Sequence, residues 1–124
     1  MVPIGLGIRH GAAVPYTSYM KITADEARRI ADHADTYDLL VAPHCIASPL
    51  GTVASVHLCA AIPNFAVLEF HGQDVPFWDD ILTGGEPLIR GGRVRVPDGP
   101  GLGVELNEAL AREYRKRGEG FFEE

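Results

Sequence analysis

Two residues that can move protons stand at the ends of two predicted strands. His44 follows the apolar run at 38–43, and Glu69 closes the run at 65–69. In parallel α/β folds, catalytic groups gather at the carboxyl ends of the strands. A histidine exchanges protons near neutral pH. The sequence therefore predicts a proton-transfer site that contains His44 and Glu69.

The elements around these residues must place the two strand ends side by side. An unbroken apolar stretch at 39–42 favours a strand buried on both faces, as in parallel sheets. Upstream, Thr23 and Glu26 have the spacing of a capping box, which begins a helix. A strand, a helix and a strand in this order predict a right-handed βαβ unit. The predicted elements are a helix at 24–37, a strand at 38–43, a helix at 52–61 and a strand at 65–70.

The two ends of the chain have a different character. Residues 1–20 scatter Gly and Pro without a helical or strand period, and the GLG at 5–7 lacks the context of a dinucleotide site. The C-terminal part is predicted to contain a short helix at 76–82, a hairpin of 88–90 and 94–96 around a Gly-Gly pair, a turn at 97–103 and a helix at 105–117. We divide the chain into an atypical N-terminal segment 1–20, an α/β part 21–84 and a C-terminal segment 85–124.

Composition limits the classes of protein to consider. With 124 residues, 46% of them hydrophobic, one compact domain is expected. A net charge of −6 without a basic cluster argues against a nucleic-acid partner. No apolar run approaches the ~20 residues that span a bilayer, and the N-terminus lacks the pattern of a secretory signal. Two cysteines do not make a disulfide scaffold, so a cytoplasmic protein without a membrane partner is expected.

Four stretches carry a resemblance to a known family: EARRIADHADTYDLLVAPH, SPLGTVASVHLCAAIPNF, VLEFHGQD and VPDGPGLGVEL. From about Lys21 to Tyr114, the chain resembles the carboxy-terminal part of the mandelate racemase/muconate lactonizing enzyme family of the enolase superfamily. Within that family it is most similar to sugar-acid dehydratases of the galactonate and gluconate type. The stretches cover roughly three quarters of the chain and arrive in the family's order.

The resemblance implies a fold class and a place in it. The expected fold is α/β, a C-terminal fragment of a (β/α) TIM-type barrel. Residues 24–37 would be the sixth barrel helix, 38–43 the seventh strand and 65–69 the eighth. The hairpin and the last helix would return towards a cap domain.

The resemblance also implies a chemistry and its residues. The family removes the proton beside a carboxylate to give an enediolate held by Mg²⁺, and the dehydratases then lose a β-hydroxyl to yield a 2-keto-3-deoxy sugar acid. His44 matches the histidine that serves as acid or base. Glu69 matches the glutamate that contacts the substrate carboxylate, in its protonated form because two anions repel. His71 and Asp74 are expected to line the substrate site.

Several family residues are missing from this sequence. The carboxylate ligands of Mg²⁺ belong to the third to fifth strands and the catalytic lysine to the second, and none of these strands is present. The aspartate that would pair with the histidine falls at Thr17, and a typical glycine pair reads Ile22-Thr23. We therefore expect a remnant of a longer gene, with residues 1–20 of different origin. Such a segment would need a partner chain or further copies of itself to be complete.

The remaining candidate residues receive structural roles. His10 and His33 are assigned to the surface and His57 to helix packing, while Phe77 and Trp78 are expected to anchor a core or interface. No metal ligand is predicted in this chain, because its cysteines and histidines lack the paired spacing of a zinc site. Three functions stay open: a sugar-acid dehydratase segment, a racemase or cycloisomerase segment of the same superfamily, and an inactive fragment that self-associates.

Overall fold

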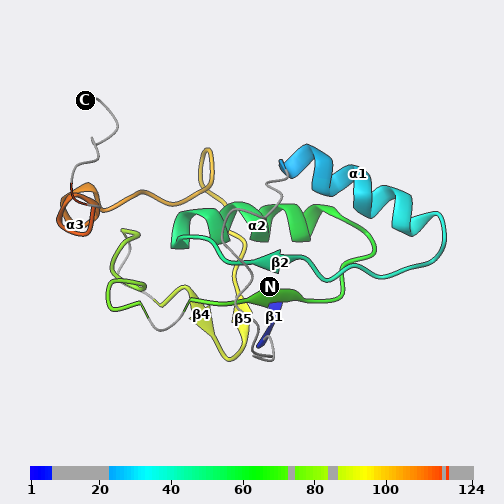
Figure 1. Cartoon of the computed structure of the whole chain (residues 1–124), viewed down its shortest axis with the longest axis horizontal. Helices are drawn as coiled ribbons and strands as arrows, with labels where there is room; N and C mark the ends of the chain where they lie inside the picture. Colours follow the sequence, from blue (N-terminus) through cyan, green and yellow to red (C-terminus); the bar gives the residue numbers. More distant parts are fainter. Residues whose placement is uncertain (7–22, 73–74, 84–86, 116, 118–124) are drawn as a thin grey trace.

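A computed structural model of the chain describes residues 1–6, 23–72, 75–83, 87–115 and 117 (Figure 1). Its elements in chain order are β1 (Val2–Leu6), α1 (Ala24–Asp35), β2 (His44–Cys45), α2 (Pro49–Ala61), β3 (Leu68–Phe70), β4 (Ile89–Arg90), β5 (Arg93–Val94) and α3 (Glu108–Glu113). The strands form one sheet in the order β2-β3-β1-β5-β4. In Figure 1, α2 lies beside β2, and α1 and α3 lie at opposite ends of the molecule. No helix in the described part is long and apolar enough to cross a membrane.

The first helix begins where the sequence predicts. The Thr23 hydroxyl accepts a hydrogen bond from the Glu26 backbone N–H at 3.2 Å, and the Glu26 carboxylate accepts one from the Thr23 N–H at 2.7 Å. This reciprocal pair is the predicted capping box, which is confirmed. The helix ends at Asp35, two residues before the predicted end, and Asp38 then takes a φ of 54°. That left-handed conformation turns the chain back towards the sheet.

The second helix packs the sheet from one side. Its N-cap is Ser48, whose hydroxyl accepts from the Gly51 N–H at 3.3 Å, and Pro49 occupies the first turn, where it needs no N–H partner. The helix therefore starts three residues before the predicted Thr52. The core cluster joins this helix to three strands through the buried side chains of Cys45, Val56, Cys59, Leu68 and Val94.

β2 and β3 run parallel on either side of α2 in the chain, as the predicted βαβ unit requires. Both strands are shorter than predicted, and the upstream stretches 38–43 and 65–67 meet only at a Val41–Phe65 bridge. The predicted burial of 39–42 on both faces is wrong, because Leu39 and Leu40 are 58% and 72% exposed. Both leucines precede β2 and lie outside every strand of the described part, so the sheet does not hold them against the core.

The N-terminal segment contains a strand that the sequence analysis missed. β1 runs parallel to β3, with Ile4 opposite Leu68 and Gly5 opposite Glu69, and antiparallel to β5 on its other side. Pro3 and Gly5 hide the strand from a pattern search, since both residue types are poor strand formers. The expectation of no regular structure is therefore wrong for this stretch. Residues 7–20 lie outside the described part.

The C-terminal part is built from short pieces. β4 and β5 form an antiparallel hairpin whose turn residues, Gly91 and Gly92, have φ values of 54° and 70°. A two-residue turn with both φ values positive suits glycine and matches the twist of the flanking strands. The last helix, α3, is shorter than the predicted 105–117. It begins after Asn107, whose side chain accepts from the Leu110 N–H at 3.2 Å.

The predicted helix at 76–82 is wrong, because this stretch forms turns. Its Trp78 side chain is buried and meets Phe70 edge to face, with ring centroids 5.1 Å apart. Phe77 contacts the ring of Tyr114, with centroids 4.3 Å apart. Both aromatic residues thus act as packing anchors, and the backbone of the stretch forms turn bonds, such as the one from the Trp78 N–H to the Val75 carbonyl at 3.1 Å, in place of a helical series.

Candidate active site

His44 and Glu69 lie side by side because their strands are in register. His44 of β2 is the register partner of Glu69 of β3, and the Glu69 N–H donates to the Pro43 carbonyl at 2.9 Å. Side chains alternate between the faces of a strand. Cys45 and Leu68 are buried in the core, so the opposite face of the sheet carries His44 and Glu69. The core thereby holds the backbone under both polar side chains.

The two side chains make direct contact. His44 Nδ1 and a Glu69 carboxylate oxygen are 2.8 Å apart. The side chains are 46% and 41% exposed, so solvent and small molecules reach them. His71 comes two residues after Glu69, just beyond the end of β3, and the centroid of its ring lies 5.3 Å from the centroid of the His44 ring. The structure therefore brings three of the four predicted site residues together, and the fourth, Asp74, lies outside the described part.

The contact sets the protonation pattern that the pair can use. When Nδ1 of His44 donates to an ionised Glu69, the lone pair is on Nε2, which can then take a proton. A carboxylate on Nδ1 also stabilises the imidazolium that results. The family resemblance implied that an aspartate pairs with His44, and the corresponding position of this chain is Thr17, which lies outside the described part. Within the described residues, Glu69 supplies that carboxylate.

Among the described residues, two further histidines and two cysteines have structural contacts of their own. His57 Nε2 lies 3.0 Å from the Leu102 carbonyl, in keeping with the predicted packing role. His33 packs edge to face on Tyr37 at the end of α1. Cys45 and Cys59 are both buried free thiols, and burial raises the pKa of the Cys59 thiol to about 11. A buried thiol with a raised pKa is a packing group, not a nucleophile.

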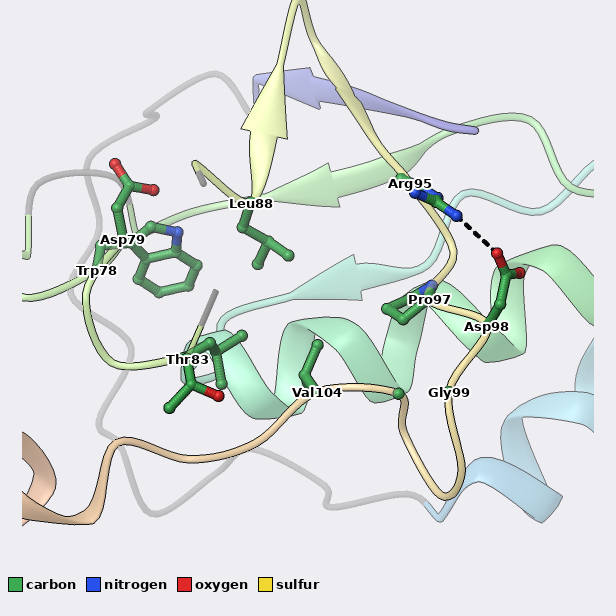
Figure 2. Close-up of a pocket in the computed structure, with 11 residues that line it drawn as sticks. Trp78, Asp79, Thr83, Leu88, Arg95, Pro97, Asp98, Gly99 and Val104 are labelled. Atoms are coloured by element: carbon green, nitrogen blue, oxygen red, sulfur yellow. Dashed lines mark hydrogen bonds and ion pairs between the residues drawn. The ribbon is translucent and has the colours of Figure 1, made fainter. Parts of the chain in front are cut away.

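Two hollows lie near the sheet. One, of about 450 Å³, opens beside His44 between α1 and α2, and its other polar lining residues are Thr23 and Ser55. A second, of about 490 Å³, lies under the hairpin and the turn after it (Figure 2). Figure 2 shows Trp78 on one side of the second hollow and an Arg95–Asp98 ion pair of 2.7 Å on the other. Of these two hollows, the first has His44 in its lining and the second has no residue of the proton-transfer pair, and the sequence pattern had pointed to neither hollow.

The expected Mg²⁺ does not fit the donors that the described residues assemble. Mg²⁺ demands a near-octahedral set of oxygen ligands. The cluster at the strand ends offers one carboxylate and two imidazoles, from Glu69, His44 and His71. This set is poor in oxygen and rich in nitrogen. These three residues are therefore not a Mg²⁺ site.

Comparison with known proteins places the chain in a family. The family model described as "Enolase C-terminal domain-like" matches residues 19–110. A D-xylonate dehydratase of Haloferax volcanii is 40% identical over 99 residues, which are 80% of this chain and 24% of that protein. A D-galactonate dehydratase of Ralstonia nicotianae is 32% identical over 93 residues, covering 71% of this chain and 24% of the relative.

Solved structures agree. A mandelate racemase/muconate lactonizing enzyme-like protein from Rubrobacter xylanophilus is 48% identical, with a TM-score of 0.74 over 80% of this chain and 25% of that one. The chain thus spans about a quarter of the length of its relatives. Its mixed helices and strands are those of part of a TIM-barrel domain. The chain belongs to the enolase C-terminal domain-like family of mandelate racemase and muconate lactonizing enzymes.

Proposed function

We propose that this chain is the segment of a sugar-acid dehydratase that supplies the proton-transfer pair His44–Glu69. The observation that supports the proposal is the 2.8 Å contact between Nδ1 and the carboxylate at the ends of two parallel strands. The names of two relatives, D-xylonate dehydratase and D-galactonate dehydratase, support the substrate class, an aldonate.

The proposed reaction removes water from the aldonate. The carbon beside the carboxylate loses its proton, and the hydroxyl on the next carbon leaves with a proton as water. The resulting enol then loses the proton of its hydroxyl group and gains a proton on the carbon that lost the leaving hydroxyl, which gives a 2-keto-3-deoxy acid. His44 takes or delivers protons at Nε2. Because Glu69 contacts Nδ1 of His44, we propose that Glu69 holds the ring and balances the imidazolium, in place of the expected contact between a protonated Glu69 and the substrate carboxylate. His71 and Asp74 are proposed to contact the hydroxyl groups of the substrate.

The proposal requires the rest of a barrel. Negative charge builds up when a proton leaves next to a carboxylate, and a divalent metal ion such as Mg²⁺, held by oxygen ligands outside this cluster, would supply the positive charge that balances it. We propose that its ligands come from a partner chain or from further copies of this chain. The edge strand β2 is a suitable docking point, because unpaired strand edges accept another strand. Leu39, Leu40 and Ile46 beside this edge are all more than half exposed.

A chimera with an established relative tests the function. In the Haloferax volcanii D-xylonate dehydratase, the matched quarter is replaced by the corresponding residues of this chain, and 2-keto-3-deoxy acid formation from D-xylonate is measured. We expect turnover that falls roughly 10²–10⁴-fold in His44→Gln, the range typical of a lost general acid or base. The matched control His33→Gln changes a histidine on the surface of α1 and should keep full activity.

The outcomes separate the three functions. Equal turnover in the His44→Gln and His33→Gln chimeras would refute the assigned role of His44. Turnover of a lactone in place of the aldonate would favour the cycloisomerase alternative, and a D-galactarolactone cycloisomerase of Agrobacterium fabrum is 31% identical to this chain. A folded but inert chimera, together with large metal-independent oligomers of the native chain, would favour a self-associating fragment without catalysis.

A further inference from the structure

The face of the sheet that carries the proton-transfer pair also carries a third donor, which changes what the site can bind. We infer that His44, Glu69 and His71 form a binding site for one borderline divalent transition-metal ion, with Zn²⁺ as the reference ion. One ligand atom from each of the three side chains can be chosen such that all three lie within 4.8 Å of one another. This inference does not depend on the chain being an enzyme.

The backbone places the three donors. Glu69 and His71 are two residues apart, a spacing that keeps two side chains on the same side of an extended chain. The His71 N–H donates to the Cys45 carbonyl at 3.1 Å, which continues the β2–β3 pairing beyond the end of β3. His44 joins them as the register partner of Glu69. The cluster is therefore fixed by strand pairing above a buried core and does not rely on a free loop.

The separations are compatible with coordination. Zn²⁺ binds imidazole nitrogen at about 2.0–2.1 Å and carboxylate oxygen at about 2.0–2.2 Å, so tetrahedral ligands stand roughly 3.3 Å apart. His44 Nδ1 and a Glu69 carboxylate oxygen are 2.8 Å apart, and the three candidate ligand atoms lie within 4.8 Å of one another, two distances that bracket this spacing. All three side chains are exposed or half-buried, which gives an ion access and leaves a fourth position for water.

The donor types select the ion. Two imidazole nitrogens and one carboxylate oxygen suit Zn²⁺, Co²⁺, Ni²⁺ and Cu²⁺, whereas Mg²⁺ and Ca²⁺ take oxygen ligands. Two histidines with one carboxylate and an open position form the arrangement of a reactive metal site, not of a closed structural one. An ion bound between His44 Nδ1 and Glu69 would replace the contact that orients the His44 ring for proton transfer, so metal binding should suppress acid–base chemistry at His44.

Titration of the native chain tests the site. The full-length protein without an affinity tag is titrated with ZnCl₂ by calorimetry, with MgCl₂ in a parallel experiment, and with CoCl₂ by visible absorption. We expect one Zn²⁺ per chain, no heat with Mg²⁺, and Co²⁺ bands of the intensity that four- or five-coordination produces. Replacement of His71 by Ala should weaken Zn²⁺ binding roughly 100-fold or more, since even outer-shell partners contribute 10–100-fold. His33→Ala is the matched control and should bind like the native chain.

A second measurement avoids reliance on the variants. Imidazole nitrogen resonances of the native chain are recorded with and without Zn²⁺. The signals of His44 and His71 should move together at one equivalent, while those of His33 and His57 should stay in place. The inference is overturned if His33 or His57 responds in their place, if His71→Ala binds as tightly as the native chain, or if Mg²⁺ competes with Zn²⁺ at equal concentration.

Discussion

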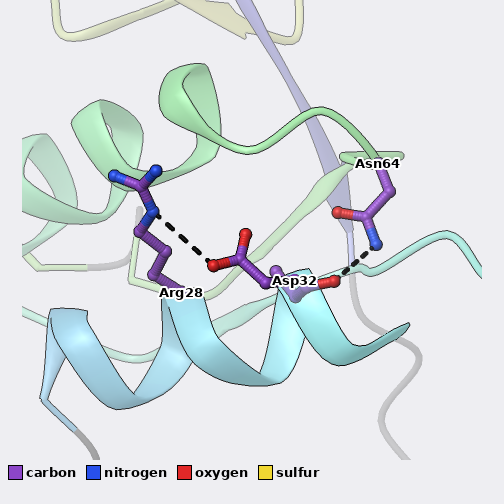
Figure 3. Close-up of polar contacts among 4 residues, drawn as sticks. Arg28, Asp32 and Asn64 are labelled. Atoms are coloured by element: carbon purple, nitrogen blue, oxygen red, sulfur yellow. Dashed lines mark hydrogen bonds and ion pairs between the residues drawn. The ribbon is translucent and has the colours of Figure 1, made fainter. Parts of the chain in front are cut away.

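Asn64 ties the first helix to the chain that leads into β2, and its loss should have a measurable effect on stability. Asn64 is 4% exposed, and its side-chain amide donates to the carbonyls of Ala31 at 3.0 Å and Leu39 at 2.9 Å. Figure 3 shows the Asn64 side chain pointing towards α1, where Arg28 and Asp32 form an ion pair of 3.8 Å. The backbone carbonyl of Asn64 accepts a hydrogen bond from the Val41 N–H at 2.9 Å. One residue thus connects α1, the approach to β2 and the start of β3.

The size of the effect follows from these bonds. A net hydrogen bond contributes about 1 kcal/mol, so Asn64→Ala, which removes two, should lower the free energy of unfolding by about 2 kcal/mol. Asn64→Asp keeps the shape but replaces the donor with a carboxylate oxygen that faces the same two carbonyls. An uncompensated buried charge costs more, and we expect a loss of about 3 kcal/mol or more at neutral pH.

Urea unfolding followed by far-UV circular dichroism, at matched protein concentrations, measures both variants. With an m-value of roughly 1–3 kcal/mol/M, a loss of 2 kcal/mol shifts the midpoint by about 1 M. The difference between the two variants should shrink in acid, because a protonated Asp can donate one hydrogen bond again. Equal stability of Asn64→Asp and the native chain at neutral pH would refute this account of the contact, and so would equal losses in the Ala and Asp variants.

Three further perturbations follow from single contacts. Gly72→Ala should lower the melting temperature, because Gly72 has a φ of 137° and an added Cβ would lie 2.9 Å from the Trp78 ring; backbone strain of this kind costs about 1–3 kcal/mol, and an unchanged melting temperature would contradict it. The Cys59 thiol, with its pKa raised to about 11 by burial, should react with a disulfide reagent at mildly alkaline pH only after unfolding, and a fast reaction of the native protein would show that it is accessible. Hydrogen bonds from Thr23 lower the pKa of Glu26 in the folded protein. The stabilisation of α1 by Glu26 is therefore complete at pH values above the unfolded pKa of Glu26 and is lost as the pH falls through its folded pKa. Glu26→Gln should flatten the acid-dependent loss of helicity, measured by circular dichroism.

Local signals predicted the local features of the fold. The capping box needs only Thr23 and Glu26, three residues apart, and the structure forms it as predicted. The predicted start of α2 is three residues too late. The true start has a signal that is just as local, an N-cap serine at Ser48 followed by Pro49. β1 could not be predicted in this way, since its partners β3 and β5 lie more than sixty residues further along the chain.

The candidate site was predicted in part for the same reason. His44 and Glu69 stand directly after apolar runs, and a polar residue at the end of a buried run is visible in the sequence. The sequence did not predict the cluster of His44, Glu69 and His71 as a metal site. Glu69 and His71 lie twenty-five or more residues after His44, and only the strand register brings them to it. Metal motifs that can be recognised in a sequence have ligands a few residues apart, and this cluster does not.

The central position of β1 has a consequence for how the chain acquires its structure during synthesis. This strand leaves the ribosome before β3 and β5, its partners in the sheet, so the sheet cannot close until residue 94 has emerged. Closing so long a loop is entropically costly and slows folding. Until then, the nascent strand carries unpaired backbone groups that chaperones or another strand can occupy.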